Sequence, residues 1–168
     1  MKDGQEKIYY ASGESVDKID MLPVVERFKD KEYEVLYLND YVDEFTLQSL
    51  MEYDGHKFVN VNNDDVDLDT EEEKEELKKR NEDSKDMFEF MNEVLDEVKT
   101  VRFTNKLKKH PVCLSTEGNI SLEMEKVLNS MPDAQKVKAE VVLEINEEHP
   151  IADKLKDLYE SDKSELEK

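Results

Sequence analysis

The sequence contains a single cysteine, no tryptophan, and only four glycines and four prolines among its 168 residues. Because Cys113 has no second cysteine to pair with, an internal disulfide is excluded, and we expect a reducing, cytoplasmic environment. No run of about 18 apolar residues occurs, so no segment is expected to span a membrane. The first residues also lack the apolar stretch that a secretory signal requires.

Positive charge is scarce as well. The chain has 24 Lys and Arg residues against 44 Asp and Glu residues, which gives a formal net charge of −20. This balance argues against nucleic acid as a partner, because binding to phosphates needs basic patches, and equally against anionic membrane surfaces. Apolar residues still make up 37% of the chain, too many for a disordered acidic tail, so we expect one folded domain or two small ones.

One acidic stretch has the spacing of a calcium-binding loop. Its acids stand at positions 1, 3, 5 and 12 of an EF-hand pattern: Asp65, Asp67, Asp69 and Glu76. Position 6 of that loop needs glycine for a sharp turn, and Thr70 stands there instead. We therefore interpret the stretch as an acidic linker exposed to solvent rather than as a metal site.

No group of residues has the spacing of a known catalytic motif. Gly13 follows a predicted strand, but a single glycine does not make a phosphate-binding loop. His110 and Cys113 are close in sequence, yet two ligands do not make a metal site, and a cysteine flanked by apolar residues is usually a small core residue. We predict no catalytic residue, no cofactor and no metal ligand in this chain.

The first 62 residues alternate between strand and helix patterns. Apolar runs predict strands over residues 8–11, 33–38 and 57–61, the second of them buried on both faces. Helices are expected to begin after Ser15, at Pro23 and after Asp43 as a cap, the last with an apolar side formed by Leu47, Leu50 and Met51. Strand, helix and strand within about 30 residues imply parallel pairing, so we predict a small three-layer α/β unit.

A second pattern begins after an acidic linker. It predicts a long, charged helix to about residue 98, whose second half is apolar on one side, and then a hairpin of strands over 101–103 and 112–114. A loop over 115–119 and a helix from Ser121 to Met131 follow. Strict alternation over 139–145 predicts a half-buried strand, and Pro150 opens a last helix.

The predicted fold class combines α/β with α+β. A small three-layer α/β subdomain over residues 1–69 is joined by the long charged helix to a second, mixed α+β domain over residues 70–168. The chain begins almost directly with a core strand and stops without a helix-ending signal, so we expect it to be a piece of a longer protein.

Several short blocks resemble the heat-shock protein 90 chaperone family, in its bacterial HtpG branch. They keep the family's order and span nearly the whole chain: Glu6–Tyr10, Gly13–Ser15, Tyr33–Leu38, Asp43-Glu44, Asp54-Gly55, Asn105–Leu107 leading to Pro111, Met124-Glu125, Leu143–Asn146 and His149-Pro150. The resemblance implies a cytoplasmic, ATP-dependent chaperone of the stress response. It implies that this piece covers the end of the middle domain and the first part of the C-terminal domain.

In that assignment the parent is a homodimer that binds ATP and magnesium outside this sequence. The piece itself is then not an enzyme and holds no cofactor, while it relays conformational change and contacts unfolded client proteins. The resemblance implies contact through an amphipathic helix and a nearby aromatic residue, and the candidate residues are Phe45, Ile120, Val127, Leu128 and Met131. The alternative is a stand-alone acidic adaptor that binds a basic partner electrostatically and loses it in salt.

Overall fold

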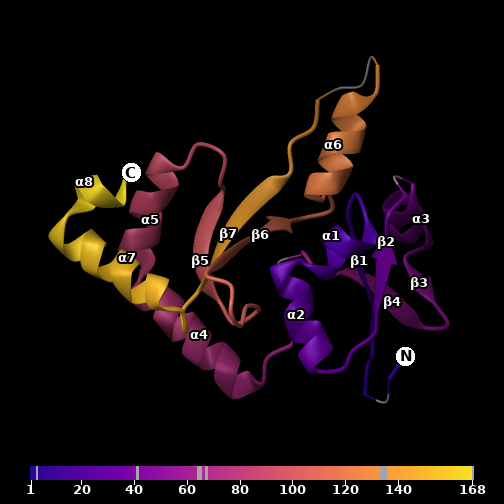
Figure 1. The fold of residues 1–168 in the computed structure, drawn as a ribbon, viewed down its shortest axis with the longest axis horizontal. Coiled ribbons are helices and arrows are strands. Elements are labelled where there is room, and N and C mark those ends of the chain that lie inside the picture. The colour runs from indigo at the N-terminus through magenta and orange to yellow at the C-terminus, as the bar shows by residue number, and fades with distance from the viewer. Residues whose placement is uncertain (3, 41, 64–65, 67, 133–135, 168) are drawn as a thin grey trace. The chain divides into compact units, whose positions relative to one another are not determined.

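The computed structural model describes residues 1–2, 4–40, 42–63, 66, 68–132 and 136–167 (Figure 1). The chain forms two compact units, each of which combines helices with a β-sheet, so the predicted mixed fold class is confirmed. The first unit contains Met1–Val66 and Thr116–Glu140, and the second contains Asp67–Ser115 and Val141–Lys168. The segment over residues 116–140 therefore packs with the first unit, and the predicted domain boundary after residue 69 stays a prediction.

The first unit is built around a four-stranded sheet. Its strands are β1 (Ile8–Ser12), β2 (Val35–Leu38), β3 (Glu52–Tyr53) and β4 (His56–Asn60), in the order β2-β1-β4-β3. β1 pairs in parallel with both β2 and β4, whereas β3 and β4 form an antiparallel hairpin. The helices are α1 (Val16–Asp20), α2 (Pro23–Asp30), α3 (Asp43–Leu50) and α6 (Leu122–Ser130). The parallel β1–β2 pairing confirms the prediction.

Helices cover both faces of this sheet. Successive side chains of a strand point to opposite faces, so Tyr9 and Tyr10 of β1 face different helices. Tyr9 packs edge-on against Phe28 of α2, with ring centroids 4.7 Å apart. Tyr10 is buried on the other face, close to Glu44 and Gln48 of α3. The predicted three-layer arrangement is therefore present.

Most local signals for helix starts and turns hold in this unit, but Asp43, predicted as a cap, is the first residue of α3 and makes no side-chain cap bond. The Ser15 hydroxyl accepts a hydrogen bond from the Lys18 backbone N–H at 3.3 Å and caps α1, and Pro23 is the first residue of α2. Asp54 and Gly55 join β3 to β4 with φ values of 50° and 78°. Positive φ at both central positions is what a tight hairpin turn requires.

Two predictions about burial in the first unit are wrong. β2 was expected to be buried on both faces, but it forms an edge of the sheet, and Leu36 is 46% exposed. The apolar side predicted for α3 from Leu47, Leu50 and Met51 is not buried as a whole, since Leu50 and Met51 are 51% and 70% exposed and Met51 ends the helix with φ of 62°. The buried residue of α3 is Glu44 instead.

The second unit places helices against a three-stranded sheet. The strands are β5 (Thr100–Thr104), β6 (Val112–Glu117) and β7 (Glu140–Asn146), and the helices are α4 (Glu71–Asp83), α5 (Lys85–Val94), α7 (Pro150–Ser161) and α8 (Lys163–Leu166). α5 and α7 contribute to one apolar core with β5 and β7, and its buried members are Met87, Phe88, Val101, Phe103, Ile145 and Ala152. The apolar second half of the predicted long helix does form a docking face.

Three predictions for the second unit need correction. The single long helix is two helices, α4 and α5, because the backbone departs from helical geometry at Ser84 (Figure 1). The strands over 101–103 and 112–114 are not a hairpin, since β7 lies between β5 and β6 and pairs in parallel with β5. β6 also continues through Glu117, where a loop was expected. Long-range pairing of this kind leaves no local signal.

The inward and outward positions of β7 also differ from the prediction. Strict alternation placed Glu144 on the solvent side, but this residue is fully buried in the structure. Its carboxylate is paired with Arg102 Nη2 at 2.6 Å and with Lys106 Nζ at 3.1 Å. A buried acid is tolerated where cations and hydrogen bonds replace water.

None of the helices in the described part of the chain combines the length and the apolar character that a membrane span needs.

Candidate functional site

The amphipathic helix α6 is fixed at both ends by hydrogen bonds within the first unit. Ser121 forms its N-cap and accepts a hydrogen bond from the Met124 backbone N–H at 3.1 Å. Near the other end, the Asn129 amide exchanges hydrogen bonds of 2.8 and 2.9 Å with the Val137 backbone. Glu125 accepts a further bond of 2.7 Å from the Ala139 backbone N–H. These contacts hold α6 against the segment that leads into β7.

A buried carboxylate connects α6 with the sheet. Glu44 of α3 is only 4% exposed and accepts three hydrogen bonds of 2.8 Å, from the hydroxyls of Ser12 and Ser121 and from the Asn60 amide. None of these three donors carries a charge. One side chain of α3 thus joins β1, β4 and the first turn of α6.

Two neighbours of Glu44 show how closely α3 and the sheet are packed. Burial, followed by the charge of Glu44, raises the pKa of the Tyr10 hydroxyl to about 12. Gln48, one turn further along α3, donates hydrogen bonds to the Asn119 carbonyl at 2.8 Å and to the Met124 sulfur at 3.0 Å. The link between α3 and α6 therefore rests on several bonds rather than one.

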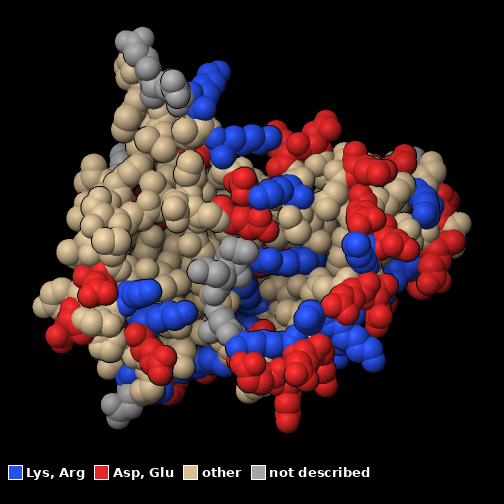
Figure 2. Space-filling view, turned by 180° about the vertical axis from the view of Figure 1, so that it is seen from behind, with Lys and Arg blue, Asp and Glu red and all other residues tan. Residues whose placement is uncertain are grey.

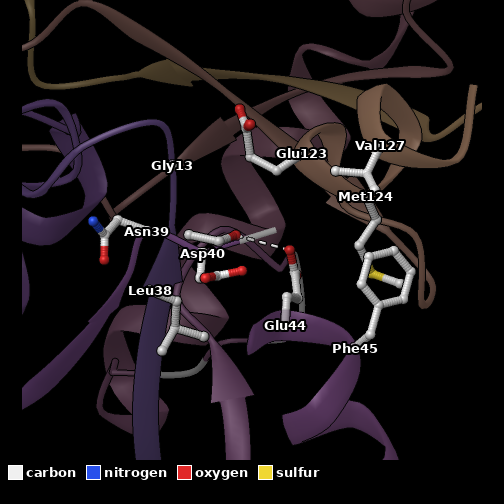
Figure 3. Close-up of a pocket in the computed structure, with 10 residues that line it drawn as sticks. Gly13, Leu38, Asn39, Asp40, Glu44, Phe45, Glu123, Met124 and Val127 are labelled. Carbon is white, nitrogen blue, oxygen red and sulfur yellow. Dashed lines mark hydrogen bonds between the residues drawn. The ribbon is translucent and has the colours of Figure 1, made fainter. Parts of the chain in front are cut away.

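A pocket opens beside this link, between α3 and α6 (Figure 3). One part of its lining is apolar, with the Phe45 ring beside the side chains of Met124 and Val127. The other part is acidic and contains Asp40, Glu44 and Glu123. The dashed line that ends on Glu44 in Figure 3 marks the hydrogen bond that its carboxylate accepts from the Ser12 hydroxyl. The pocket lies wholly within the first unit.

The structure brings some of the sequence-predicted contact residues together. Phe45 and Val127 line the pocket from opposite helices. Leu128 and Ile120 are half-buried and do not belong to the lining, and Met131 follows α6 with 49% exposure. Whether these five residues contact a client remains a prediction. Figure 2 shows a broad area with few charged side chains on the left, over part of the first unit.

Sequence reasoning missed the acidic half of this pocket. Asp40 and Glu44 were not among the predicted site residues, and neither was Met124, which was named in the family-like block Met124-Glu125. Acids are usually exposed unless they are paired or hydrogen-bonded, so an acid at the start of a helix reads as a surface residue. The available signal was the pair Asp43-Glu44 in one of the family-like blocks.

A second polar cluster lies in the second unit around Glu144. Its carboxylate binds Arg102 and Lys106, and the Cys113 thiol lies 3.7 Å from its second oxygen. Burial, followed by the charge of Glu144, raises the pKa of the Cys113 thiol to about 12. At that pKa the thiol stays protonated near neutrality and is a poor nucleophile or metal ligand.

Metal binding was considered at two places in the sequence. Among the described residues, no group of three or more His, Cys, Asp or Glu side chains is arranged to hold an ion. Of the EF-hand-like positions, Asp65 and Asp67 lie outside the described residues. The carbonyl of His110 accepts a hydrogen bond from the Asn146 amide at 3.1 Å, which gives this histidine's backbone a structural role.

By fold, this is a protein of two mixed α/β units. The first unit holds a pocket between α3, which begins with two acidic residues, and the amphipathic helix α6. The chain belongs to the Hsp90 family, because the family model described as "Hsp90 protein" matches residues 1–168. It is 50% identical to chaperone protein HtpG of Clostridium acetobutylicum and 45% identical to that of Bacillus subtilis, over 100% and 99% of this chain. It is also 50% identical to the HtpG of Natranaerobius thermophilus, over 99% of this chain. The chaperone family named from the short blocks is thus confirmed.

The chain spans 27% of the length of the first two relatives and 26% of the third. Two predictions are corrected by this membership, namely that the chain is not an enzyme and that it holds no cofactor. Both predictions rested on the absence of short catalytic motifs from the sequence and on the position assumed for this chain within the whole protein. The match to HtpG runs through the entire chain, and active sites are built from residues far apart in sequence. The missing motifs therefore exclude neither an enzymatic role nor a cofactor for this chain.

Proposed function

We propose that this chain contacts unfolded client proteins through the surface formed by α3 and α6 of the first unit. The observation that carries the proposal is the pocket in which Phe45, Met124 and Val127 lie together. Met131 extends this apolar surface beyond the end of α6 with 49% exposure. Unfolded proteins expose apolar side chains, and an apolar surface of this kind gives them a place to bind.

The second part of the proposal is a relay of conformational change. Glu44 holds the start of α6 to the sheet, and the chain that leaves α6 continues into β7, the central strand of the second unit's sheet. A client that shifts α6 therefore acts on a segment that is covalently continuous with the second unit. Hydrogen bonds between α6 and the segment before β7, at Asn129 and Glu125, support this coupling.

The whole protein would then be a cytoplasmic, dimeric chaperone that depends on ATP and magnesium. We further propose that this chain joins the end of the family's middle domain to the start of its C-terminal domain. The order of the family-like blocks along the sequence supports this assignment. Reading the coding sequence on either side of the chain tests it directly, since the rest of the family's middle domain should lie upstream.

Client contact is tested in the full-length chaperone by placing charges on α6. Val127→Asp combined with Leu128→Asp is expected to reduce suppression of client aggregation several-fold, because it puts unpaired charge on an apolar surface. Turnover of ATP by the variant should continue. Met21→Asp is the matched control, since Met21 is 69% exposed and follows α1. Unchanged aggregation suppression in the double variant would refute client contact at α6.

The acidic adaptor makes a different prediction about salt. Binding to a basic partner through the net charge of −20 should weaken steeply as ionic strength rises, because exposed charges are screened within about 10 Å at 0.1 M salt. Apolar client contact should persist under the same conditions. A client titration at low and high salt therefore separates the two functions.

A further inference from the structure

The pocket between α3 and α6 has more negative charge than its own contacts neutralise. Its lining contains Asp40, Glu44 and Glu123, and none of the described lining residues is Lys, Arg or His. Glu123 is paired with Lys126 at 2.7 Å. The donors that reach the other two acids are uncharged: the Val42 backbone N–H for Asp40, and two hydroxyls and one amide for Glu44. The pocket therefore favours a positively charged group.

The remaining lining is apolar and stands close to the acids. Phe45 follows Glu44 directly in α3, and its ring lies beside Met124 and Val127 of α6 (Figure 3). A group that fits both parts has a positive head and an aliphatic stem. Lysine and arginine side chains have this form, because their methylene groups pack on apolar surfaces while the head stays with polar partners. An aromatic ring adds a favourable contact for a cation.

We propose that this pocket receives a lysine or arginine side chain of an unfolded client. The cationic head lies toward Asp40, the exposed acid of the lining, and the stem packs against Phe45, Met124 and Val127. This assignment rests on the client contact proposed above and specifies which client side chain the contact selects. A purely apolar side chain would cover the carboxylates without pairing them, which is unfavourable, and an acidic side chain would be repelled.

The experiment measures fluorescence anisotropy of labelled extended peptides with the 168-residue chain. Three peptides share the same apolar residues and differ at one central position, which is lysine, norleucine or glutamate. Norleucine keeps an aliphatic stem without the charge, so the lysine peptide should bind roughly threefold to tenfold more tightly than the norleucine peptide. The glutamate peptide should bind most weakly. The preference for lysine should shrink between about 50 and 500 mM salt.

Asp40→Asn is the variant that localises this preference. Asp40 is exposed, so its replacement should leave the fold intact, and the preference for lysine over norleucine should fall at least twofold. Asp17→Asn is the matched control, because it makes the same change of charge at an exposed position of α1 outside the pocket. Its preference should equal that of the unaltered chain.

The outcomes separate this proposal from the one on which it rests. Equal binding of the lysine and norleucine peptides, or an equal loss in both variants, overturns the cationic pocket while client contact stands. A preference that persists unchanged at high salt also contradicts it. Failure of all three peptides to bind overturns the pocket and counts against client contact as well.

Discussion

The hydroxyl of Ser121 donates a hydrogen bond of 2.8 Å to the carboxylate of Glu44, which lies 77 positions earlier in the chain. The same oxygen accepts a bond of 3.1 Å from the Met124 backbone N–H. One atom therefore caps α6 and attaches it to α3. Because α6 carries the proposed client-contact residues, the position of that surface depends on this pair.

Replacing Ser121 with alanine should loosen α6. The variant loses both the N-cap and one of the three donors to a buried carboxylate, and each loss costs roughly 1 kcal/mol, so the free energy of unfolding should fall by about 1–3 kcal/mol. Urea titration measures this loss, and hydrogen exchange should show faster exchange of α6 amides. Ser130→Ala at the other end of α6 is the control, since its hydroxyl bonds only locally to the Val127 carbonyl. An equal loss in both variants would refute a special role for the Ser121–Glu44 pair.

Much of the first unit was predictable because its signals are local. The βαβ pattern, the Ser15 cap, Pro23 at the start of α2 and the Asp54-Gly55 turn each depend on neighbouring residues. Such features follow from backbone preferences that operate within a few positions. They position α3 and thereby one side of the pocket.

The helix from Ser121 was also predicted, but the polar contacts inside the pocket and the order of the second sheet could not be predicted in this way. Glu44 is buried because donors from Ser12, Asn60 and Ser121 converge on it, and these come from three separate parts of the chain. The place of β7 between β5 and β6 likewise depends on pairing across about 40 residues. Burial of an acid and strand order are decided by tertiary contacts, so neither follows from local pattern.

Glu144 should be essential for the stability of the second unit. Glu144→Ala removes the partner of Arg102 and Lys106 and leaves two cations against a buried cavity, which should cost about 2–4 kcal/mol. Thermal unfolding followed by circular dichroism measures the effect. Glu148→Ala is the control at an exposed position of the same segment. If both variants unfold at the same temperature, the buried cluster contributes no net stability.

Cys113 should be unreactive in the folded chain. With the pKa of its thiol at about 12 instead of 9.0, the thiolate fraction at pH 8 is roughly a thousandfold lower than for an unperturbed cysteine. Alkylation by iodoacetamide at pH 8 should therefore be slow in the native chain and fast in urea. Because the chain has one cysteine, mass spectrometry reports this site alone. Equal rates in both conditions would contradict the burial of this thiol beside Glu144.

The same shift predicts lower stability in alkali. As the pH rises from 9 to 12, the unfolded thiol ionises while the folded thiol keeps its proton, so the free energy of unfolding falls. Tyr10 adds to the fall, since burial raises its pKa from 10.0 to about 12. Cys113→Val removes the first contribution and should give a shallower decline over this range. A decline of the same slope in the variant would assign it to other groups.

Client contact at α6 is tested most directly by site-specific photocrosslinking in the full-length chaperone. A photoreactive residue at Val127, in the pocket lining, should crosslink to an unfolded client, and the same residue at Met21, also exposed in the first unit, should not. Excess unlabelled client should abolish the Val127 adduct. Crosslinking at Met21 but not at Val127, or equal crosslinking at both, would contradict the account.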